Sequence, residues 1–243
     1  MAHIIDVNSR VGPGRPHEAR PLDLALREMD QSGIESAWIH PSDAFMAVLN
    51  REGNALIRDA VRAQPDRFVG CAVANPWFGQ DAADELRRAF GDGLRALYLN
   101  PPVQGFQLDD PLVDPLIEVA TEFAAPVMAH TGTPVCAMPL QLAALARRHP
   151  RARFVMVRMG YADFWYDGPP AAATASNIWL ETSVVDPDLL LDAIARLGAE
   201  RFLFGTSAPL ATVSIELAKV MDLGLPPDAL AKIFYLNAKG LLP

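Results

Sequence analysis

Nearly continuous apolar runs recur along the chain, and most of them are rich in β-branched or aromatic residues. Such runs indicate strands that are buried on both faces, as in a parallel sheet, because a strand with one solvated face alternates apolar and polar residues. The predicted strands are His3–Val7, Ile34–Ile39, Phe68–Ala74, Leu94–Leu99, Pro126–His130, Arg153–Arg158, Asn177–Glu181 and Arg201–Gly205.

Between the predicted strands, apolar residues recur with the spacing of one helix face, which predicts amphipathic helices. Asp186 followed by Pro187 is typical of a helix start, since Asp caps free N–H groups and Pro needs none in the first turn. Gly33 follows a helix, where glycine readily adopts the left-handed conformation that ends one. The clearest predicted helices are Leu22–Gln31, Asn54–Ala63, Ala82–Phe90, Leu112–Phe123, Leu140–Arg148, Pro187–Leu197 and Val213–Leu223.

The alternation of strands and helices favours a (β/α)8 barrel over the second choice, a Rossmann-type open sheet. No G-x-G-x-x-G motif follows the first predicted strand, which counts against a dinucleotide-binding open sheet. No linker or repeat divides the chain, so we expect one barrel domain over residues 1–243. Three irregular stretches follow predicted strands, on the face where barrels keep active sites: Val11–Pro21, Asn100–Asp110 and Gly160–Ala173.

Composition narrows the class of protein further. Of the 243 residues, 51% are hydrophobic, which is ample for the core of a barrel. Asp and Glu outnumber Lys and Arg by 29 to 21, and no basic stripe is visible, which argues against a nucleic-acid-binding protein. Only two cysteines are present, and no apolar run resembles a signal peptide or a membrane span. We therefore expect a soluble, cytoplasmic protein without disulfides.

Seven sequence motifs follow one another along nearly the whole chain. They are Ile4–Gly12 (IIDVNSRVG), Asn100–Ala120, Pro126–Gly132 (PVMAHTG), Phe154–Gly160 (FVMVRMG), Asn177–Ser183 (NIWLETS), Arg201–Pro209 (RFLFGTSAP) and Ile233–Leu242. Together they resemble the amidohydrolase-related family, in the branch that includes aminocarboxymuconate-semialdehyde decarboxylase. The resemblance implies an amidohydrolase-like TIM barrel with a C-terminal helix.

The resemblance also identifies positions at which this chain departs from the family. The family carries two histidines on its first strand, a lysine and a histidine at the end of its fourth, a histidine on its fifth, a histidine on its sixth and an aspartate on its eighth. In the same order, this chain has Asn8 and Arg10, Tyr98 and Asn100, His130, Arg158, and Ser207. Only the histidine of the fifth strand is kept.

These departures predict a site without a metal or other cofactor. A catalytic zinc needs about three protein ligands with available lone pairs. Arginine has no acceptor and stays protonated, so it removes a ligand and adds a repelling charge. A relocated metal site would need several of four other side chains to converge, which we do not expect: Cys136, Asp163, His40 and Glu181.

Two arginines, Arg10 and Arg158, are expected to point into the barrel mouth, at the place that the resemblance gives to the metal. An unpaired buried charge is costly, so an anion should meet them. Either the protein supplies it, through Glu181, Asp163 or Asp43, or a substrate supplies a carboxylate or phosphate that is bound bidentately. The sequence leaves both alternatives open.

His130 lies near these arginines in the predicted site, and like charge lowers the pKa of a histidine, so its imidazole is expected to be neutral and to act as a base or proton shuttle. Ser207 lacks the G-x-S-x-G turn of hydrolase nucleophiles, so we expect it to bond the substrate or orient water. The expected catalytic residues are His130, Arg158, Ser207 and Tyr98, and the expected substrate-binding residues are Asn8, Arg10, Asn100, His40, Trp165 and Glu181.

Two functions fit this sequence. The first is a metal-independent amidohydrolase-like enzyme, a hydrolase or a lyase of the decarboxylase type, acting on a small carboxylated cyclic or aromatic substrate. The alternative is a catalytically inactive pseudoenzyme subunit that binds a ligand or supports an intact homologue. We expect a homodimer or such a heteromer, and no nucleic-acid or membrane partner. Loop aromatics either wall a pocket or pack between subunits: Trp77, Phe78, Phe164, Trp165 and Tyr166.

Overall fold

Eight parallel strands form one sheet in the order of the sequence, from β1 to β8. The computed structural model describes residues 3–15, 18–161 and 163–242. The alternating pattern of the sequence predicts this arrangement, in which each strand lies parallel to the next and a helical crossover connects the two. The strands are β1 (Ile5–Val11), β2 (Ser36–Pro41), β3 (Phe68–Val73), β4 (Ala96–Leu99), β5 (Val127–His130), β6 (Phe154–Val157), β7 (Ile178–Glu181) and β8 (Phe202–Leu203).

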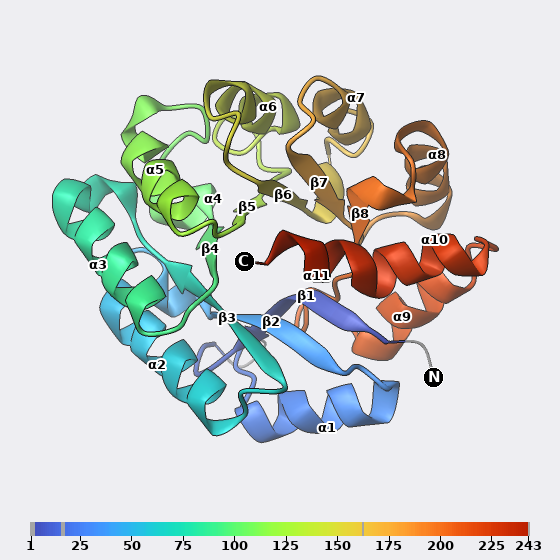
Figure 1. The fold of residues 1–243 in the computed structure, drawn as a ribbon, viewed down its shortest axis with the longest axis horizontal. Helices are drawn as coiled ribbons and strands as arrows, with labels where there is room; N and C mark the ends of the chain where they lie inside the picture. The colour runs from blue at the N-terminus through green and yellow to red at the C-terminus, as the bar shows by residue number, and fades with distance from the viewer. Residues whose placement is uncertain (1–2, 16–17, 162, 243) are drawn as a thin grey trace.

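The sheet closes where the segment that follows β8 runs along β1. The backbone N–H of Val7 donates to the carbonyl of Phe204 at 2.9 Å, and that of Ser207 donates to the carbonyl of Asn8 at 2.8 Å. This closure confirms the predicted (β/α)8 barrel, and the open-sheet alternative is wrong (Figure 1). β8 is shorter than the predicted strand Arg201–Gly205, because the N–H of Phe204 donates to the carbonyl of Ile233 in the C-terminal helical segment and that of Gly205 donates to the Thr182 side chain.

Helices surround the barrel (Figure 1). Asp186 caps α8 as predicted, accepting from the backbone N–H of Asp188 at 3.0 Å, and Gly33 ends α1 with a φ of 68°. The helices are α1 (Leu22–Ser32), α2 (Asn50–Ala63), α3 (Gly79–Gly91), α4 (Pro101–Gln104), α5 (Asp114–Glu122), α6 (Pro139–Arg148), α7 (Gly168–Ala173), α8 (Pro187–Leu197), α9 (Val213–Met221), α10 (Pro227–Ala231) and α11 (Asn237–Leu241).

Apolar side chains fill both sides of the strands, which explains their continuous apolar sequence. On β5, Met128 points into the barrel interior, whereas Val127 and Ala129 pack outward against the helices. The larger core lies between the sheet and the helices. Within the described residues, no helix combines the length and the apolar character that crossing a membrane requires.

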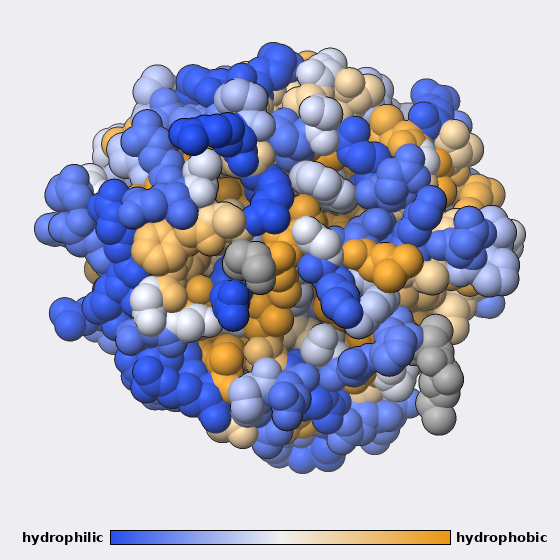
Figure 2. Space-filling model, viewed as in Figure 1, coloured by the Kyte–Doolittle hydropathy of each residue, from blue (hydrophilic) through white to orange (hydrophobic). Residues whose placement is uncertain are grey.

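The C-terminal helix α11 covers the end of the barrel at which the strands begin. Ala238 and Leu241 of α11 belong to the same buried cluster as Ile5 and Leu203 of the barrel interior. Figure 2 shows this face, with polar side chains over the outer helices and apolar side chains near its centre. We call the opposite end, where the strands finish, the mouth of the barrel.

Candidate active site at the barrel mouth

The strands carry most of the predicted site residues at or near their carboxyl ends, where a (β/α)8 barrel keeps its active site. From β1 to the segment after β8, they are Asn8, Arg10, His40, Tyr98, Asn100, His130, Arg158, Glu181 and Ser207. All of them are buried except Arg10, which is half-buried.

Glu181 ends β7 and is fully buried. Its Oε2 accepts hydrogen bonds from Asn8 Nδ2 at 3.0 Å, from the backbone N–H of Arg158 at 3.1 Å and from Ser183 Oγ at 2.8 Å. Its Oε1 accepts from the backbone N–H of Ser183 at 2.5 Å. Burial raises the pKa of Glu181 to about 7, although these bonds and the Arg158 charge act in the opposite direction.

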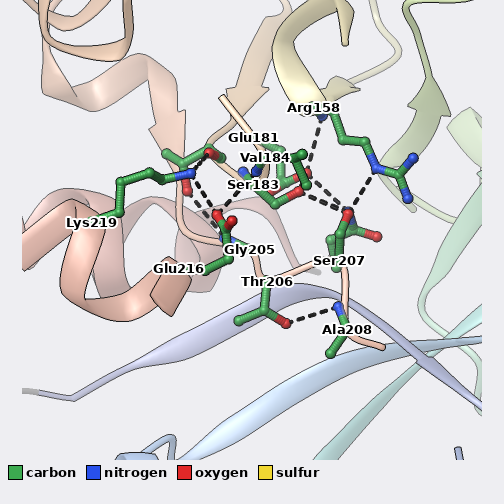
Figure 3. A network of polar contacts seen from close by, with 12 residues as sticks. Arg158, Glu181, Ser183, Val184, Gly205, Thr206, Ser207, Ala208, Glu216 and Lys219 are labelled. Carbon is green, nitrogen blue, oxygen red and sulfur yellow. Dashed lines mark hydrogen bonds and ion pairs between the residues drawn. The ribbon is translucent and has the colours of Figure 1, made fainter. Parts of the chain in front are cut away.

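Ser207 joins the same group of polar side chains (Figure 3). Its Oγ lies 2.7 Å from Asn8 Nδ2, 2.8 Å from Arg158 Nε and 2.8 Å from Ser183 Oγ, and all three can donate to it. We call Asn8, Arg158, Glu181, Ser183 and Ser207 the Glu181 network. Ser183 was not among the predicted site residues. The only sequence signal for it is its place at the end of the NIWLETS motif.

Two members of the Glu181 network have strained backbone. Arg158 has a φ of 62° and Ser207 a φ of 53°, in the left-handed region that favours glycine. Such a conformation costs about 1–3 kcal/mol in a non-glycine residue, and residues of this kind cluster at functional sites. The surrounding hydrogen bonds therefore hold both side chains in positions that the isolated backbone would disfavour.

Arg158 is a cation without an ionic partner among the described residues. Only 8% of it is exposed, its Nε donates to Ser207, and its guanidinium lies 5.5 Å from the centre of the Tyr161 ring. Figure 3 shows the two terminal nitrogens pointing away from the Glu181 network. The carboxylate of Glu181 meets the backbone N–H of Arg158 rather than its guanidinium.

Arg10, in contrast, has an internal partner. Its Nη2 lies 3.0 Å from Asp43 Oδ1, which also accepts from Asn100 Nδ2 at 3.3 Å. The sequence left open whether the protein or a substrate supplies the anion that meets each arginine. Arg10 forms an ion pair within the protein, and Arg158 forms none among the described residues. Asp163, the third carboxylate considered, is exposed.

The imidazoles of the mouth are held neutral. His40 stacks on Tyr98 with ring centres 3.8 Å apart, and its Nδ1 donates to the carbonyl of Pro41 at 2.9 Å, so its Nε2 is left as an acceptor. Burial, reinforced by the charge of Arg10, lowers the pKa of His40 well below 6.5. Burial and then Arg158 lower the pKa of His130 to about 3. Burial raises the pKa of Tyr98 to about 12, so it stays protonated at neutral pH.

The loop aromatics lie at the rim in different environments. Trp165 is half-buried against the outer core and meets Tyr161 edge-on at 6.1 Å, so its predicted contact with substrate stays a prediction. Trp77 and Tyr166 are 63% and 76% exposed, which leaves them free to contact another molecule. Cys136 is half-buried in the loop after β5.

Sequence comparison identifies the family. The sequence profile described as amidohydrolase matches residues 10–243. The chain belongs to the amidohydrolase family. This confirms the family to which the seven motifs pointed. Among curated proteins, none matches this amidohydrolase significantly.

Solved structures share the fold of this amidohydrolase at low sequence identity. The 5-carboxyvanillate decarboxylase from Sphingomonas paucimobilis has a TM-score of 0.80 and 19% identity, with 99% of each chain covered. A dihydroxybenzoic acid decarboxylase from Polaromonas sp. JS666, with bound manganese and 2-nitroresorcinol, has a TM-score of 0.80 and 20% identity over 99% of this chain and 97% of that one. The 2,6-dihydroxybenzoate decarboxylase from Rhizobium has a TM-score of 0.78 and 19% identity, covering 99% and 98%.

The manganese in that similar structure raises the question of whether the side chains here suit a divalent ion. Within residues 3–15, 18–161 and 163–242, no three His, Cys, Asp or Glu side chains lie together as metal ligands would. The oxygens of Glu181 already accept four hydrogen bonds, and Asp43 is paired with Arg10. The Arg158 guanidinium adds a repelling charge. This set of donors does not fit the ion.

Proposed function

We propose that this amidohydrolase binds a small aromatic carboxylate at the barrel mouth and releases carbon dioxide from it without a bound metal. The observation that carries the proposal is the buried Arg158 guanidinium, which has no ion pair among the described residues. Solved structures of similar fold include decarboxylases of aromatic carboxylates, which supports the substrate class. Arg158 supplies the group that binds the carboxylate, and the neutral histidines of the mouth supply hydrogen-bond acceptors for the ring hydroxyls.

Arg158 is suited to anchor the carboxylate. Because its Nε is bonded to Ser207, its two terminal nitrogens remain for the two oxygens of a carboxylate, in the parallel arrangement that arginine favours. A buried cation without a partner is unfavourable, so a bound carboxylate would offset the cost of burying the guanidinium. Hydrogen bonds to charged groups contribute about 1.5–3 kcal/mol, which corresponds to at least about tenfold in affinity.

A bound carboxylate would also change the chemistry of the histidines. The positive charge of Arg158 is the second cause of the low His130 pKa, after burial. A carboxylate on Arg158 neutralises that charge and raises the pKa of His130. The neutral imidazoles of His130 and His40 accept hydrogen bonds from hydroxyl groups of the ring, and protonated Tyr98 donates one.

The test uses 2,6-dihydroxybenzoate and, as its counterpart without the carboxylate, 1,3-dihydroxybenzene. Calorimetry should show that wild type binds the first at least about tenfold more tightly than the second, and that Arg158→Ala abolishes this preference. Arg151→Ala is the matched control, because Arg151 is exposed at the opposite end of β6. An unchanged affinity in Arg158→Ala would refute the anchoring role.

Turnover separates the two functions that the sequence allows. Carbon dioxide release from 2,6-dihydroxybenzoate by protein that is metal-free by elemental analysis, at the same rate before and after treatment with a chelator, supports the metal-independent enzyme. Binding without release would instead identify a ligand-binding pseudoenzyme. Activity that disappears with the chelator and returns with manganese would refute metal independence.

A further inference from the structure

Replacing a carboxylate on an aromatic ring by hydrogen consumes one proton, and the groups that line the mouth are poor sources of it. His40 and His130 are neutral at physiological pH, because burial and the two arginines lower their pKa values. Burial raises the pKa of Tyr98 to about 12, which makes it a weak acid. Arginine does not give up its proton in proteins. A donor must therefore lie behind these side chains.

The Glu181 network contains such a donor and a path from it. Ser183 Oγ lies 2.8 Å from Glu181 Oε2 on one side and 2.8 Å from Ser207 Oγ on the other. A serine hydroxyl has one proton, so it can donate to only one of these two oxygens at a time. When Glu181 is ionised, Ser183 donates to Glu181. When Glu181 carries a proton on Oε2, it donates to Ser183 and keeps only one of the bonds from Asn8 and the Arg158 N–H, and Ser183 donates to Ser207.

We propose that Glu181, Ser183 and Ser207 form a proton relay that delivers to the barrel mouth the proton consumed in decarboxylation. The inference rests on the proposed function, since it names the acid for that reaction. Ser207 is the catalytic residue of the relay, because it is 5% exposed whereas Glu181 and Ser183 are fully buried and act through it. The network ends at Glu181, whose side chain is fully buried and cannot touch a ligand itself.

The proton balance of the step is complete. Ser207 gives its proton to the ring carbon that bears the carboxylate, and the new C–H bond takes an electron pair from the ring. The C–C bond then breaks, its electron pair returns to the ring, and carbon dioxide leaves. In the same concerted step as the proton transfer from Ser207, Ser183 gives its proton to Ser207 and Glu181 gives its proton to Ser183, so no serine alkoxide forms and Glu181 is the acid that is consumed. Glu181 is left as a carboxylate, which takes up a proton from solvent after the products leave.

Hydrogen-bond counting links the relay to ligand binding. Asn8, Arg158 and Ser183 can all donate to Ser207 Oγ, but a hydroxyl oxygen accepts only two hydrogen bonds. When Ser183 donates to Ser207, one of the other two bonds must give way. Asn8 is the donor with other acceptors, since its Nδ2 also lies 3.0 Å from Glu181 Oε2 and 3.5 Å from Ser183 Oγ. Arg158 therefore keeps its Nε on Ser207 while its terminal nitrogens hold the carboxylate, which places the bound ligand next to the last hydroxyl of the relay.

The structure holds Ser183 firmly in place for this role. Glu216 of α9 accepts from the backbone N–H of Val184 at 3.0 Å, and Lys219 donates to the carbonyl of Thr182 at 2.8 Å (Figure 3). Glu216 and Lys219 also form a nearly buried ion pair at 2.5 Å. The residues on both sides of Ser183 are thus tied to α9, which fixes its hydroxyl between the two oxygens. The pKa of Glu181, about 7, leaves a substantial fraction of it protonated at neutral pH.

The kinetic test uses a variant that lacks the Ser183 hydroxyl, which lies between Glu181 and Ser207. With 2,6-dihydroxybenzoate, Ser183→Ala should lower kcat roughly a hundredfold with little change in KM, since general acid catalysis contributes about 10²–10⁴-fold. Ser183→Thr, which restores a hydroxyl, should recover most of the loss, and Ser214→Ala on the exposed surface of α9 should behave as wild type. Ser183→Ala with wild-type kcat and pH profile would overturn the relay, as would failure of Ser183→Thr to differ from Ser183→Ala.

Infrared spectroscopy tests the relay even if wild type releases no carbon dioxide. Near neutral pH, wild type should show the C=O stretch of a protonated carboxyl group that is absent in Glu181→Gln. That band should shift to higher wavenumber in Ser183→Ala, where the proton loses its acceptor, and return in Ser183→Thr. A missing band, or one that Ser183→Ala leaves unchanged, would overturn the relay. The expected band in a protein without turnover would refute the decarboxylase function alone.

Discussion

Replacing Glu181 by glutamine should change how stability depends on pH, whatever it does to stability at a single pH. Burial raises the pKa of Glu181 from 4.5 to about 7 in the folded protein. Between these values the folded chain binds a proton that the unfolded chain does not. Glu181 therefore adds stability at low pH, and this contribution is lost as pH rises through about 7. Glutamine cannot titrate, so the variant loses the whole contribution.

The magnitude follows from the two pKa values. Between pH 7 and pH 5, the Glu181 contribution grows by about 2 kcal/mol. His130 acts in the opposite direction, because its folded pKa of about 3 lies below the ordinary 6.5, so the unfolded chain binds the extra proton. Its contribution falls by about 2 kcal/mol over the same interval. In wild type the Glu181 contribution offsets that of His130, and Glu181→Gln exposes the loss due to His130, to which His40 adds because burial also lowers its pKa.

Urea unfolding at pH 7, 6 and 5 measures this difference. Relative to wild type, Glu181→Gln should lose about 2 kcal/mol more unfolding free energy on going from pH 7 to pH 5. Glu118→Gln, which changes an exposed glutamate on α5, controls for the loss of one acidic group. Parallel pH curves for wild type and Glu181→Gln would show that the Glu181 carboxyl does not titrate in this range, and the reasoning from burial would fail.

Two further predictions concern the mouth and its supporting loops. Arg158→Ala should raise the pKa of His130, measured by NMR titration, but leave it below 6.5, because burial is the larger cause and Arg10 remains. An unchanged pKa would show that the Arg158 guanidinium lies too far away to affect His130. Gly132→Ala should destabilise the protein by at least about 3 kcal/mol in urea unfolding, since its Cβ would lie 1.3 Å from the carbonyl oxygen of Tyr161 and its φ is 104°. Gly91→Ala, with open space around its Cβ, should cost little, and equal unfolding midpoints for the two variants would contradict this account.

The sequence predicted the barrel because its strands are buried on both faces. Residues such as Val127, Met128 and Ala129 of β5 must all be apolar when one side meets the interior and the other meets helices. The position of the site followed as well, since parallel strands end at one face, which brings Asn8 and Ser207 together although they are far apart in the sequence.

The pairing of side chains within the site could not be predicted in the same way. Which carboxylate meets which arginine depends on angular position around the barrel and on the path of each loop. Asp43 reaches Arg10 because a short 3-10 turn follows β2, and Glu181 meets the backbone rather than the guanidinium of Arg158 because that residue has a positive φ. Ser183 could not be assigned a role from its place at the end of the NIWLETS motif, since a single serine is common in any loop.

The closure of the barrel by the segment after β8 has a consequence for biosynthesis. Thr206 donates to the buried carboxyl group of Asp6, and the two lie 200 positions apart in sequence. Contacts of such separation form slowly, because a long loop must close before they contribute. During synthesis on the ribosome, β1 cannot pair with the segment after β8 until that segment has been made, so the site at the strand ends forms last. Nascent chains therefore expose an unpaired strand edge for most of synthesis, which makes chaperone binding and low growth temperature the conditions that favour soluble expression.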